Sequence, residues 1–325
     1  MSVVDGRPDG RADGRVDGRV DGRVDDRGDG RADERSVLIT GCSSGIGRAT
    51  AERFGARGWR VFASMRRPDG GEPLRRLAAE KGWRLTTPAL DVTRDDSVAR
   101  AVEAVLAETG GRLDVLVNNA GYYAYGPLEE TSPDELRDQL ETNVVGVHRV
   151  TRAVLPAMRA RASGTVVTIG SLSGRVALPI VGPYHASKWA LEGMIESWRL
   201  ELASFGVRMA LIEPGPFATA FHANERTPGA SRPDSPYAGL VAAYRRQSAG
   251  LRRATDLAIV VDAIERAATA ADPRLRWPVG PTAISAGRLR PFVPDRLYEW
   301  IMRLAFRPRR PRGDDRRRTD GSLRL

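Results

Sequence analysis

An apolar run leads into a glycine-rich turn at Val37-Leu38-Ile39-Thr40-Gly41-Cys42-Ser43-Ser44-Gly45-Ile46-Gly47. The apolar run predicts a buried strand, and the residues after the turn predict a helix. Glycines allow the tight turn and a close approach of the backbone to a ligand, and the N-terminus of the helix offers N–H groups and a positive dipole to a pyrophosphate. The spacing is G-x-x-x-G-x-G rather than the G-x-G-x-x-G of the usual dinucleotide fingerprint. The segment favours a phosphate-binding turn after the first strand of an α/β fold.

The same residues also match G-x-S-x-G, the nucleophile elbow of α/β hydrolases, with Ser43 as the nucleophile. Such an elbow follows several strands of its sheet, whereas this turn follows the first. A triad also needs a late histidine, and the only histidine after His185 is His222, in an irregular region. The hydrolase is therefore the less favoured of the two interpretations.

Segments typical of strands alternate with segments typical of helices along the rest of the chain. Ser132-Pro133-Asp134-Glu135 predicts a helix start, because it combines an N-cap serine, a proline at the first helical position and a glutamate in the capping-box place. This alternation predicts a parallel sheet with helices on both faces. Further strands are predicted at Arg60–Ser64, near Leu85–Leu90, at Val115–Val117, Val166–Ile169 and Met209–Ile212, and near Trp277–Val279.

The composition limits the class of protein. The chain has 325 residues, of which 41% are hydrophobic and 28% charged, enough for one large domain or two modest ones. With one cysteine, Cys42, and three histidines, an internal disulfide framework, a zinc finger and an HExxH metalloprotease are excluded. The sequence lacks a run of about 18 apolar residues and the apolar core of a signal peptide, so we expect a cytoplasmic protein without a transmembrane segment.

The net charge of +10 predicts a basic surface, which could attract nucleic acid, membranes or phosphorylated small molecules. Only two of the 51 basic residues are lysines, Lys81 and Lys188, so the abundance of arginine says little about nucleic acid. The sequence has no recognition-helix motif or stacking platform, and no nucleic-acid partner is expected. The rarity of lysine makes each lysine a candidate functional residue.

The two ends of the chain differ in composition from the middle. Residues 1–35 repeat a four-residue unit, such as Asp9-Gly10-Arg11-Ala12, without Leu, Ile or aromatic residues, and are predicted to be disordered. They could form a binding arm, or they could result from an upstream start codon. Residues 307–325 are predicted to form a disordered basic tail. The folded domain is therefore expected at residues 36–306.

Two segments of the folded domain depart from the alternation of strands and helices. Residues 216–253 are rich in Pro, Gly and Arg, a composition that fits either a substrate loop or lid or an ordinary surface excursion. Residues 294–306 are predicted to form an amphipathic helix. We favour packing of its apolar face against the lid or core. The alternative is peripheral contact with a membrane, which the arginines of this helix would support. This amphipathic face is formed by Leu297, Trp300, Ile301 and Leu304.

A tyrosine and a lysine stand one helical turn apart in Tyr184-His185-Ala186-Ser187-Lys188, which leads into a helical pattern. A free tyrosine has a pKa of about 10, too high for an acid or base at neutral pH. A neighbouring ammonium favours the phenolate and lowers that pKa. The alternative is an ordinary tyrosine and lysine at a helix start, but this chain uses arginine almost everywhere else. Tyr184 and Lys188 are therefore a candidate catalytic pair.

Two more polar residues join this pair. Ser171 follows the predicted fifth strand, where its hydroxyl can bond a substrate oxygen. Asn143 lies inside the helix predicted from Pro133, and a buried asparagine needs partners. It either closes a gap in the backbone hydrogen bonding or orders a water that relays protons to Lys188.

Together these motifs resemble the short-chain dehydrogenase/reductase family over about residues 36–306, most closely the subgroup of 17β-hydroxysteroid dehydrogenase type 1 and the retinol dehydrogenases. The resemblance implies one doubly wound Rossmann-type parallel sheet of about seven strands, flanked by helices, with a C-terminal substrate lid. It implies a homodimer or homotetramer through the helices around 133–160 and 184–203. It also implies cofactor contacts at Gly41, Ser43, Ser44, Gly45, Ile46, Gly47, Asp91, Val92, Asn118, Ala120, Gly121, Tyr184, Lys188, Pro214, Gly215 and Thr219.

The resemblance further implies hydride transfer between a nicotinamide cofactor and a carbonyl or alcohol. Tyr184 would protonate the nascent alkoxide in reduction, or take the hydroxyl proton in oxidation. Lys188 would lower the pKa of the tyrosine and hold the nicotinamide ribose. Ser171 would bond the carbonyl oxygen, and Asn143 would place a relay water. The alternative is a non-catalytic dinucleotide-binding sensor or scaffold of the same fold, against which the intact set of four residues argues.

The cofactor prediction depends on the residues after the second strand, Ser64-Met65-Arg66-Arg67. NAD sites usually carry an acid there, whereas arginines such as Arg66 accommodate the 2′-phosphate of NADP. NADP(H) is therefore favoured over NAD(H), with a solvated turn as the alternative. The substrate is expected to be an apolar ketone, aldehyde or alcohol of steroid, retinoid or polyketide type. Its site is expected to be lined by Tyr122, Tyr123, Tyr125, Leu172, Leu178, Val181, Phe217 and Phe221.

Overall fold

The computed structural model describes residues 35–216, 235–251 and 256–307. These residues belong to one unit that starts at Arg35. The predicted repeat at 1–35 and the predicted tail at 307–325 lie, apart from one residue each, outside the described residues. The same holds for Thr219 and for residues 217–234 and 252–253 of the predicted lid.

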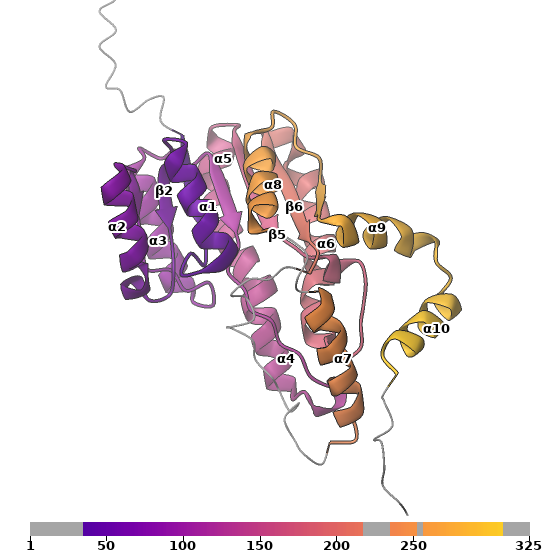
Figure 1. Cartoon of the computed structure of the whole chain (residues 1–325). Helices are drawn as coiled ribbons and strands as arrows, with labels where there is room; N and C mark the ends of the chain where they lie inside the picture. The colour runs from indigo at the N-terminus through magenta and orange to yellow at the C-terminus, as the bar shows by residue number, and fades with distance from the viewer. Residues whose placement is uncertain (1–34, 217–234, 252–255, 308–325) are drawn as a thin grey trace, which may run out of the picture. The chain divides into compact units, whose positions relative to one another are not determined.

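Seven parallel strands form a single sheet in the described part of the chain, in the order β3-β2-β1-β4-β5-β6-β7 (Figure 1). The strands are β1 Ser36–Ile39, β2 Arg60–Ala63, β3 Leu85–Thr86, β4 Val115–Asn118, β5 Gly164–Ile169, β6 Val207–Pro214 and β7 Arg276–Val279. The strand order reverses between β1 and β4, so the carboxyl ends of these strands bound the crevice where doubly wound sheets bind their ligands. The predicted fold class is confirmed.

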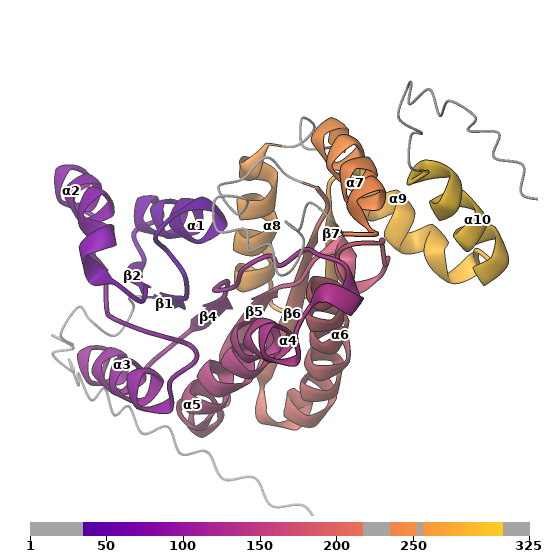
Figure 2. The same ribbon diagram turned by 90° about the horizontal axis from the view of Figure 1, so that it is seen from below.

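Helices cover both faces of the sheet, with α1, α2 and α8 on one face and α3, α5 and α6 on the other (Figure 2). The helices are α1 Gly45–Ala56, α2 Glu72–Lys81, α3 Asp95–Glu108, α4 Pro133–Leu140, α5 Gly146–Ala160, α6 Gly182–Leu202, α7 Ala238–Leu251, α8 Leu257–Thr269, α9 Pro281–Leu289 and α10 Asp295–Ala305. Val37 and Ile39 of β1 pack with Phe54 of α1, whereas Leu38 packs in the other layer with Met158 of α5. The two layers of the core follow from the alternation of side chains along a strand.

The third strand is shorter than the segment near Leu85–Leu90 that the sequence predicts. Only Leu85–Thr86 pairs with β2, and one isolated bridge joins Ala89 to Met65. Pro88 lies between these two pairings and has no N–H to donate, so it interrupts the ladder.

The helix predicted from Pro133 begins there but is interrupted. Ser132 accepts from the backbone N–H of Glu135 and Glu135 accepts from that of Ser132, which completes the predicted capping box. After α4, a π-helical turn at Glu141–Val145 contains Asn143, and α5 follows it. The sequence does not predict this turn, because its residues suit an α-helix equally well.

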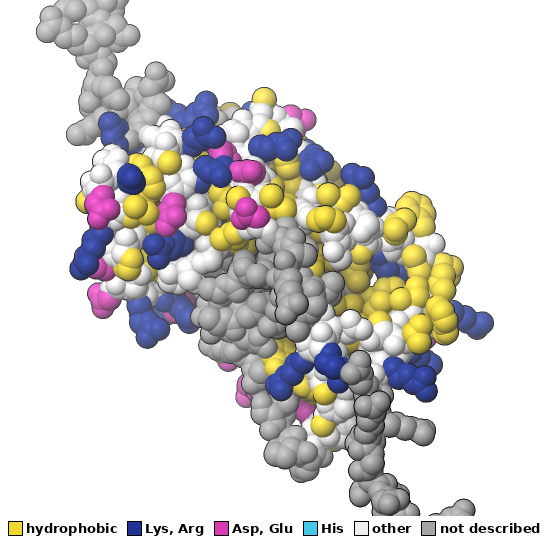
Figure 3. Space-filling model, in the orientation of Figure 1, with side chains coloured by type: hydrophobic (Ala, Val, Ile, Leu, Met, Phe, Trp, Pro, Cys, Tyr) yellow, Lys and Arg dark blue, Asp and Glu magenta, His cyan; other side chains and the backbone are white. Residues whose placement is uncertain are grey.

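The C-terminal helix forms where predicted, but its apolar face is not packed as favoured. Leu297, Trp300, Ile301 and Leu304 of α10 are 39–61% exposed, so the favoured packing of this face against the lid or core is wrong. The helix does pack on the predicted lid segment, but from a neighbouring side, where Met302 and Phe306 contact Tyr244 of α7. Figure 3 shows hydrophobic side chains gathered over α9 and α10. No helix among the described residues is long and apolar enough to span a bilayer.

Candidate active site

The glycine-rich turn at the carboxyl end of β1 is tied to the end of β4. The Oγ1 of Thr40 accepts the backbone N–H groups of Asn119 and Ala120, each at 3.0 Å. In return, Nδ2 of Asn119 donates to the carbonyl oxygens of Thr40 at 2.8 Å and Gly41 at 3.0 Å. These bonds fix the separation of the two strand ends that bound the crevice. Asn119 is not among the predicted cofactor residues. Its position between Asn118 and Ala120, which are both predicted to contact the cofactor, is the signal in the sequence that could have identified it.

Three glycines let α1 approach this turn. Gly41 and Gly45 have φ angles of +74° and +59°, which residues with a side chain rarely adopt. A Cβ on Gly47 would lie 2.4 Å from Nδ2 of Asn119 and 2.5 Å from the carbonyl oxygen of Gly41. Ser44, the N-cap of α1, makes no side-chain capping bond, so it leaves the first N–H groups of the helix to another acceptor. The turn therefore fits a pyrophosphate.

The residues predicted to contact the adenosine half of the cofactor lie after β2 and β3. Arg66 and Arg67 are exposed and follow β2, the strand beside β1. Their planar guanidinium groups suit a phosphate. The carboxylate of Asp91 accepts from the backbone N–H of Thr93 at 3.0 Å and from its hydroxyl at 2.8 Å. Asp91 thus shapes the turn that leads to α3, and Val92 beside it is buried.

Three of the four predicted catalytic residues meet at the carboxyl end of β5. Tyr184 and Lys188 lie one turn apart on α6, and both side chains are buried. The hydroxyl of Tyr184 is hydrogen-bonded to that of Ser171, which follows β5. The Nζ of Lys188 donates to the carbonyl oxygen of Ile169, the last residue of β5, at 2.8 Å. The structure therefore places a phenol, a hydroxyl and an ammonium around one strand end.

Burial governs the protonation of the tyrosine and the lysine. It raises the pKa of Tyr184, while the hydrogen bond with Ser171 acts in the lowering direction and Tyr244 in the raising one. Burial lowers the pKa of Lys188 to about 8. The ammonium of Lys188 lies 5.5 Å from the centroid of the Tyr184 ring. Burial of the phenol thus outweighs the lowering of its pKa that the sequence predicts from the lysine.

Asn143, the fourth predicted catalytic residue, is buried in the π-helical turn. Its Oδ1 accepts the backbone N–H of Tyr122, and its Nδ2 donates to the carbonyl oxygen of Tyr122 and to Oγ of Ser187, each at 3.1 Å. Ser187 in turn donates to the carbonyl oxygen of Tyr184 at 2.7 Å. The amide therefore closes a gap in backbone hydrogen bonding, one of the two roles expected from the sequence. It also joins the segment after β4 to α6.

An aromatic cluster packs against Tyr184. The ring of Tyr123 meets that of Tyr184 edge to face at 4.8 Å, and the hydroxyl of Tyr123 is hydrogen-bonded to that of Tyr244 on α7. Tyr125 stacks on Tyr244 at 5.9 Å and accepts from Nη2 of Arg245 at 2.8 Å. Tyr244 and Arg245 are missed by the sequence analysis, because the irregular composition of residues 216–253 hides α7. Of the other residues expected at the substrate wall, Leu178 and Val181 join the cluster, whereas Phe217 and Phe221 lie outside the described residues.

The remaining predicted cofactor residues lie at the ends of β4 and β6. The N–H of Gly215 donates to the carbonyl oxygen of Val279 at 3.0 Å, which holds the Pro214-Gly215 pair beside β7. Asn118 is buried, and its Nδ2 donates to Oγ1 of Thr151 at 2.9 Å. These residues shape the crevice from its two sides.

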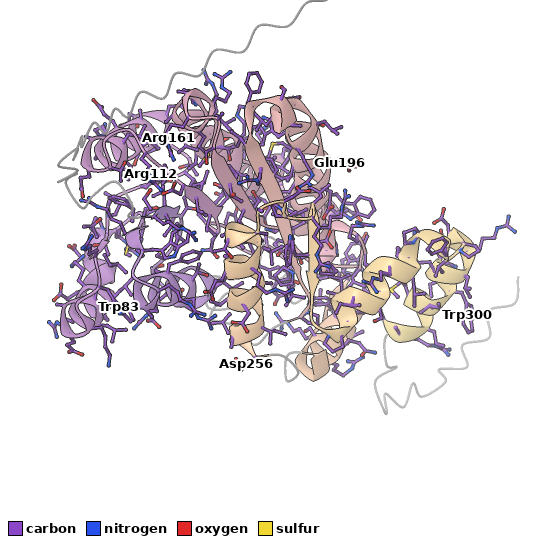
Figure 4. The ribbon with its side chains drawn as sticks, turned by 90° about the horizontal axis from the view of Figure 1, so that it is seen from above. Trp83, Arg112, Arg161, Glu196, Asp256 and Trp300 are labelled. Atoms are coloured by element: carbon purple, nitrogen blue, oxygen red, sulfur yellow. The ribbon has the colours of Figure 1, made fainter. Side chains whose placement is uncertain are left out.

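A buried pair of carboxyl groups lies next to this site and is missed by the sequence analysis. Glu213, just before the Pro214-Gly215 pair, is buried beside Glu192, one turn beyond Lys188 on α6. The Nε of Arg276 donates to Glu192 at 2.8 Å. The signal available from sequence is the spacing, since Glu192 continues the interval of four residues that separates the tyrosine and the lysine. The next residue at this interval, Glu196, is labelled on α6 in Figure 4.

Comparisons with known proteins agree with this geometry. Residues 35–229 match the family model of the short chain dehydrogenases. The chain is 46% identical over 192 residues to 17-beta-hydroxysteroid dehydrogenase type 1 of Homo sapiens, a match that covers 57% of each protein. It is similar to the solved structure of a short-chain dehydrogenase from Streptomyces avermitilis, with a TM-score of 0.72 and 36% identity, over 82% of this chain and 97% of that one. It is also similar to a metagenomic short-chain oxidoreductase in complex with NADP, with a TM-score of 0.59 and 28% identity, over 75% of this chain and 97% of that one.

The family match covers the strand–turn–helix unit, the aromatic segment after β4 and the tyrosine–lysine helix, and it agrees with the resemblance that the motifs carry. The chain therefore belongs to the short-chain dehydrogenase family of oxidoreductases.

Proposed function

We propose that the chain is an NADP(H)-dependent oxidoreductase that interconverts a ketone or aldehyde and an alcohol on an apolar substrate. The observation that carries this proposal is the buried hydroxyl of Tyr184, hydrogen-bonded to Ser171 and one helical turn from Lys188. The glycine turn supports a dinucleotide, and the two exposed arginines after β2 support a 2′-phosphate. The metagenomic relative, solved with NADP, supports the same cofactor.

Tyr184 carries out the proton transfer. When bound, the nicotinamide supplies or accepts the hydride. Tyr184 donates its hydroxyl proton to the substrate oxygen as this becomes an alkoxide, and takes a proton back in the reverse direction. Burial keeps the phenol protonated at neutral pH, which is the form that donates this proton. Ser171 donates a hydrogen bond to the same oxygen and holds it beside the tyrosine.

The other two residues position the reacting groups. Lys188 binds the ribose hydroxyl groups of the cofactor, since an ammonium has three donors and one of them is already held by Ile169. Asn143 holds the backbone of Tyr122 and the side chain of Ser187, and so fixes the substrate wall relative to α6. We infer an apolar substrate from the aromatic cluster, because its rings supply apolar surface while the hydroxyls of Tyr123, Tyr125 and Tyr244 are already hydrogen-bonded.

The substitution Tyr184→Phe tests this function. Purified protein and NADPH are screened against apolar ketones and aldehydes, steroid and retinoid types included, and turnover is followed by the absorbance of the reduced nicotinamide. We expect Tyr184→Phe to lower kcat about 10²-fold or more, because the proton donor is lost while the ring stays packed. The dissociation constant for NADPH should stay unchanged.

Tyr237→Phe is the matched control, because it removes a hydroxyl that binds Glu129 while the ring stays packed against the aromatic cluster. It should keep full turnover. Undiminished turnover of Tyr184→Phe would remove Tyr184 as the acid. A native chain that binds NADPH and turns over none of the panel would favour the dinucleotide-binding sensor instead.

A further inference from the structure

Helices α9 and α10 and the turn between them present an apolar surface that no other described element covers. Seven of the thirteen large hydrophobic side chains that are exposed in the described residues lie between residues 284 and 304. Phe292 is 84% exposed and Trp300 is 61% exposed. Figure 3 shows this concentration of hydrophobic side chains over the two helices. The seven, called here the C-terminal apolar face, are Ile284, Leu289, Phe292, Leu297, Trp300, Ile301 and Leu304.

Contacts on its other sides fix the orientation of α10. The hydroxyl of Tyr298 donates to the carbonyl oxygen of Ala177. The Nε2 of Gln247 on α7 donates to the carbonyl oxygen of Ala305 at 2.8 Å, and the ring of Phe306 stacks on that of Tyr244. Because the helix is held on two sides, the exposure of its apolar face is a property of the fold.

Positive charge surrounds this face. Between residues 288 and 307 the chain has five arginines and two acids. The acids are paired locally, Asp295 with Arg290 at 2.9 Å and Glu299 with Arg303 at 3.6 Å. Three arginines therefore remain in excess, and the sequence at 308–325 adds seven arginines and three aspartates. The dark blue side chains at the edge of the face in Figure 3 show this rim.

We propose that the C-terminal apolar face docks on the surface of an anionic lipid bilayer, with α10 lying in the plane of the headgroups. A short helix with Trp and Leu on one face and arginines at its flanks has the composition of an interfacial helix. Tryptophan prefers the membrane–water interface, where its ring is in an apolar layer and its N–H near water. Each arginine close to an anionic surface adds attraction that salt weakens. No described helix can span the bilayer, so the contact is peripheral.

The charge of the rim argues against a second copy of the chain as the occupant. A symmetric contact between two copies would bring identical faces together, each with an excess of three arginines. Like charges across an interface oppose association. An anionic bilayer supplies both an apolar layer and the opposite charge.

Vesicle flotation with the full chain tests the proposal. The vesicles are phosphatidylcholine alone, or phosphatidylcholine with about 30% phosphatidylglycerol. We expect the chain to bind the anionic vesicles at least about tenfold more tightly than the neutral ones at low salt, and to lose most of this difference at about 0.5 M salt. The double variant W300S/L304S should bind the anionic vesicles at least about tenfold more weakly, because two exposed apolar side chains no longer enter the lipid.

A matched control is L200S/F205S, which removes two exposed apolar side chains from the far end of α6 and the turn after it. It should bind vesicles like the native chain. Circular dichroism and sedimentation velocity are recorded for all three proteins. Equal binding of W300S/L304S and the native chain, or a native chain that ignores anionic vesicles, would overturn the proposal. Loss of an oligomer on W300S/L304S alone would assign the face to a second copy and overturn it equally. This test does not depend on enzymatic activity.

Discussion

Glu213 is a buried acid that should weaken the folded state at alkaline pH. It is 4% exposed at the end of β6, and its neighbour Glu192 is 7% exposed. The Oε1 atoms of the two carboxyls have no hydrogen-bond partner among the described residues, so nothing at these atoms compensates a second buried negative charge. Arg276 lies at 2.8 Å from Glu192 but 3.8 Å from Glu213, and Arg175 lies at 3.7 Å from Glu213. The arginines therefore pair with one carboxylate better than with two.

The expected size and sign follow from the pKa of this group. Burial, and then the charge of Glu192, raise the pKa of Glu213 from 4.5 to about 8. Between these two values the folded protein keeps a proton that the unfolded chain has lost, so the free energy of unfolding falls as pH rises. Each pH unit corresponds to about 1.4 kcal/mol, which over this interval gives an upper bound of about 5 kcal/mol. Relaxation and water entry reduce it, and we expect about 2–4 kcal/mol.

The substitution Glu213→Gln tests this prediction. The amide has the shape of the protonated acid and the same absence of charge, so the variant and the native chain should be similarly stable at pH 5. At pH 9 the variant should be more stable by about 2–4 kcal/mol, because it carries no charge to bury. Urea unfolding followed by tryptophan fluorescence at pH 5, 7 and 9 gives the free energies of unfolding.

Glu196→Gln is the matched control on the same helix. Its carboxylate is half exposed and binds Arg276 at 2.7 Å, and its pKa is lowered by that hydrogen bond. Removing this charge should bring no gain in stability at alkaline pH. The reasoning fails if Glu213→Gln changes the free energy of unfolding by the same amount at pH 5 and pH 9, or if it destabilises the protein at pH 9.

Two further predictions concern the cofactor site. Arg66→Glu should raise the dissociation constant for NADPH at least about tenfold and leave that for NADH nearly unchanged, since a carboxylate repels the 2′-phosphate but can bond a 2′-hydroxyl. Arg100→Glu on α3 is the control, because it makes the same charge change elsewhere. If both variants weaken NADPH binding equally in titrations, Arg66 is not part of the cofactor site. Gly47→Ala should destabilise the protein by about 1–3 kcal/mol and weaken NADPH binding, because its Cβ would lie 2.4 Å from Nδ2 of Asn119. Gly193→Ala is the control, because no atom lies within 4 Å of a Cβ added there, and it should be neutral or stabilising. Thermal unfolding of both variants measures the change in stability. If Gly47→Ala is as stable as the native chain, the turn is not tightly fixed.

Features carried by short local patterns could be predicted from the sequence. The apolar run before the glycines predicts β1, and the capping box at Ser132 predicts the start of α4. The interval between Tyr184 and Lys188 places both on one helix face, and the structure brings Ser171 to them. These predictions succeed because the spacing of residues along a strand or helix determines which side chains share a face.

Features that depend on which surface covers a face could not be predicted. The periodicity of residues 294–306 identifies an apolar face but not the neighbouring side by which Met302 and Phe306 contact α7. The π-helical turn that carries Asn143 depends on contacts with the segment after β4, which the local sequence does not encode. The expected lowering of the pKa of Tyr184 by Lys188 neglects burial, a quantity that exists only once the chain is folded.

One face of α6 connects the candidate site with the buried carboxyl pair. At intervals of four residues it carries Tyr184, Lys188, Glu192 and Glu196. Their partners lie at the end of β5 for Tyr184 and Lys188, in β6 and at the start of β7 for Glu192, and at the start of β7 for Glu196. Each partner lies on another element and becomes a neighbour because α6 packs along the strands of the sheet. The interval of four residues, continued for two more turns, is therefore enough to select both glutamates from the sequence. Their burial cannot be selected in this way, because the sequence does not distinguish the half-exposed Glu196 from the buried Glu192.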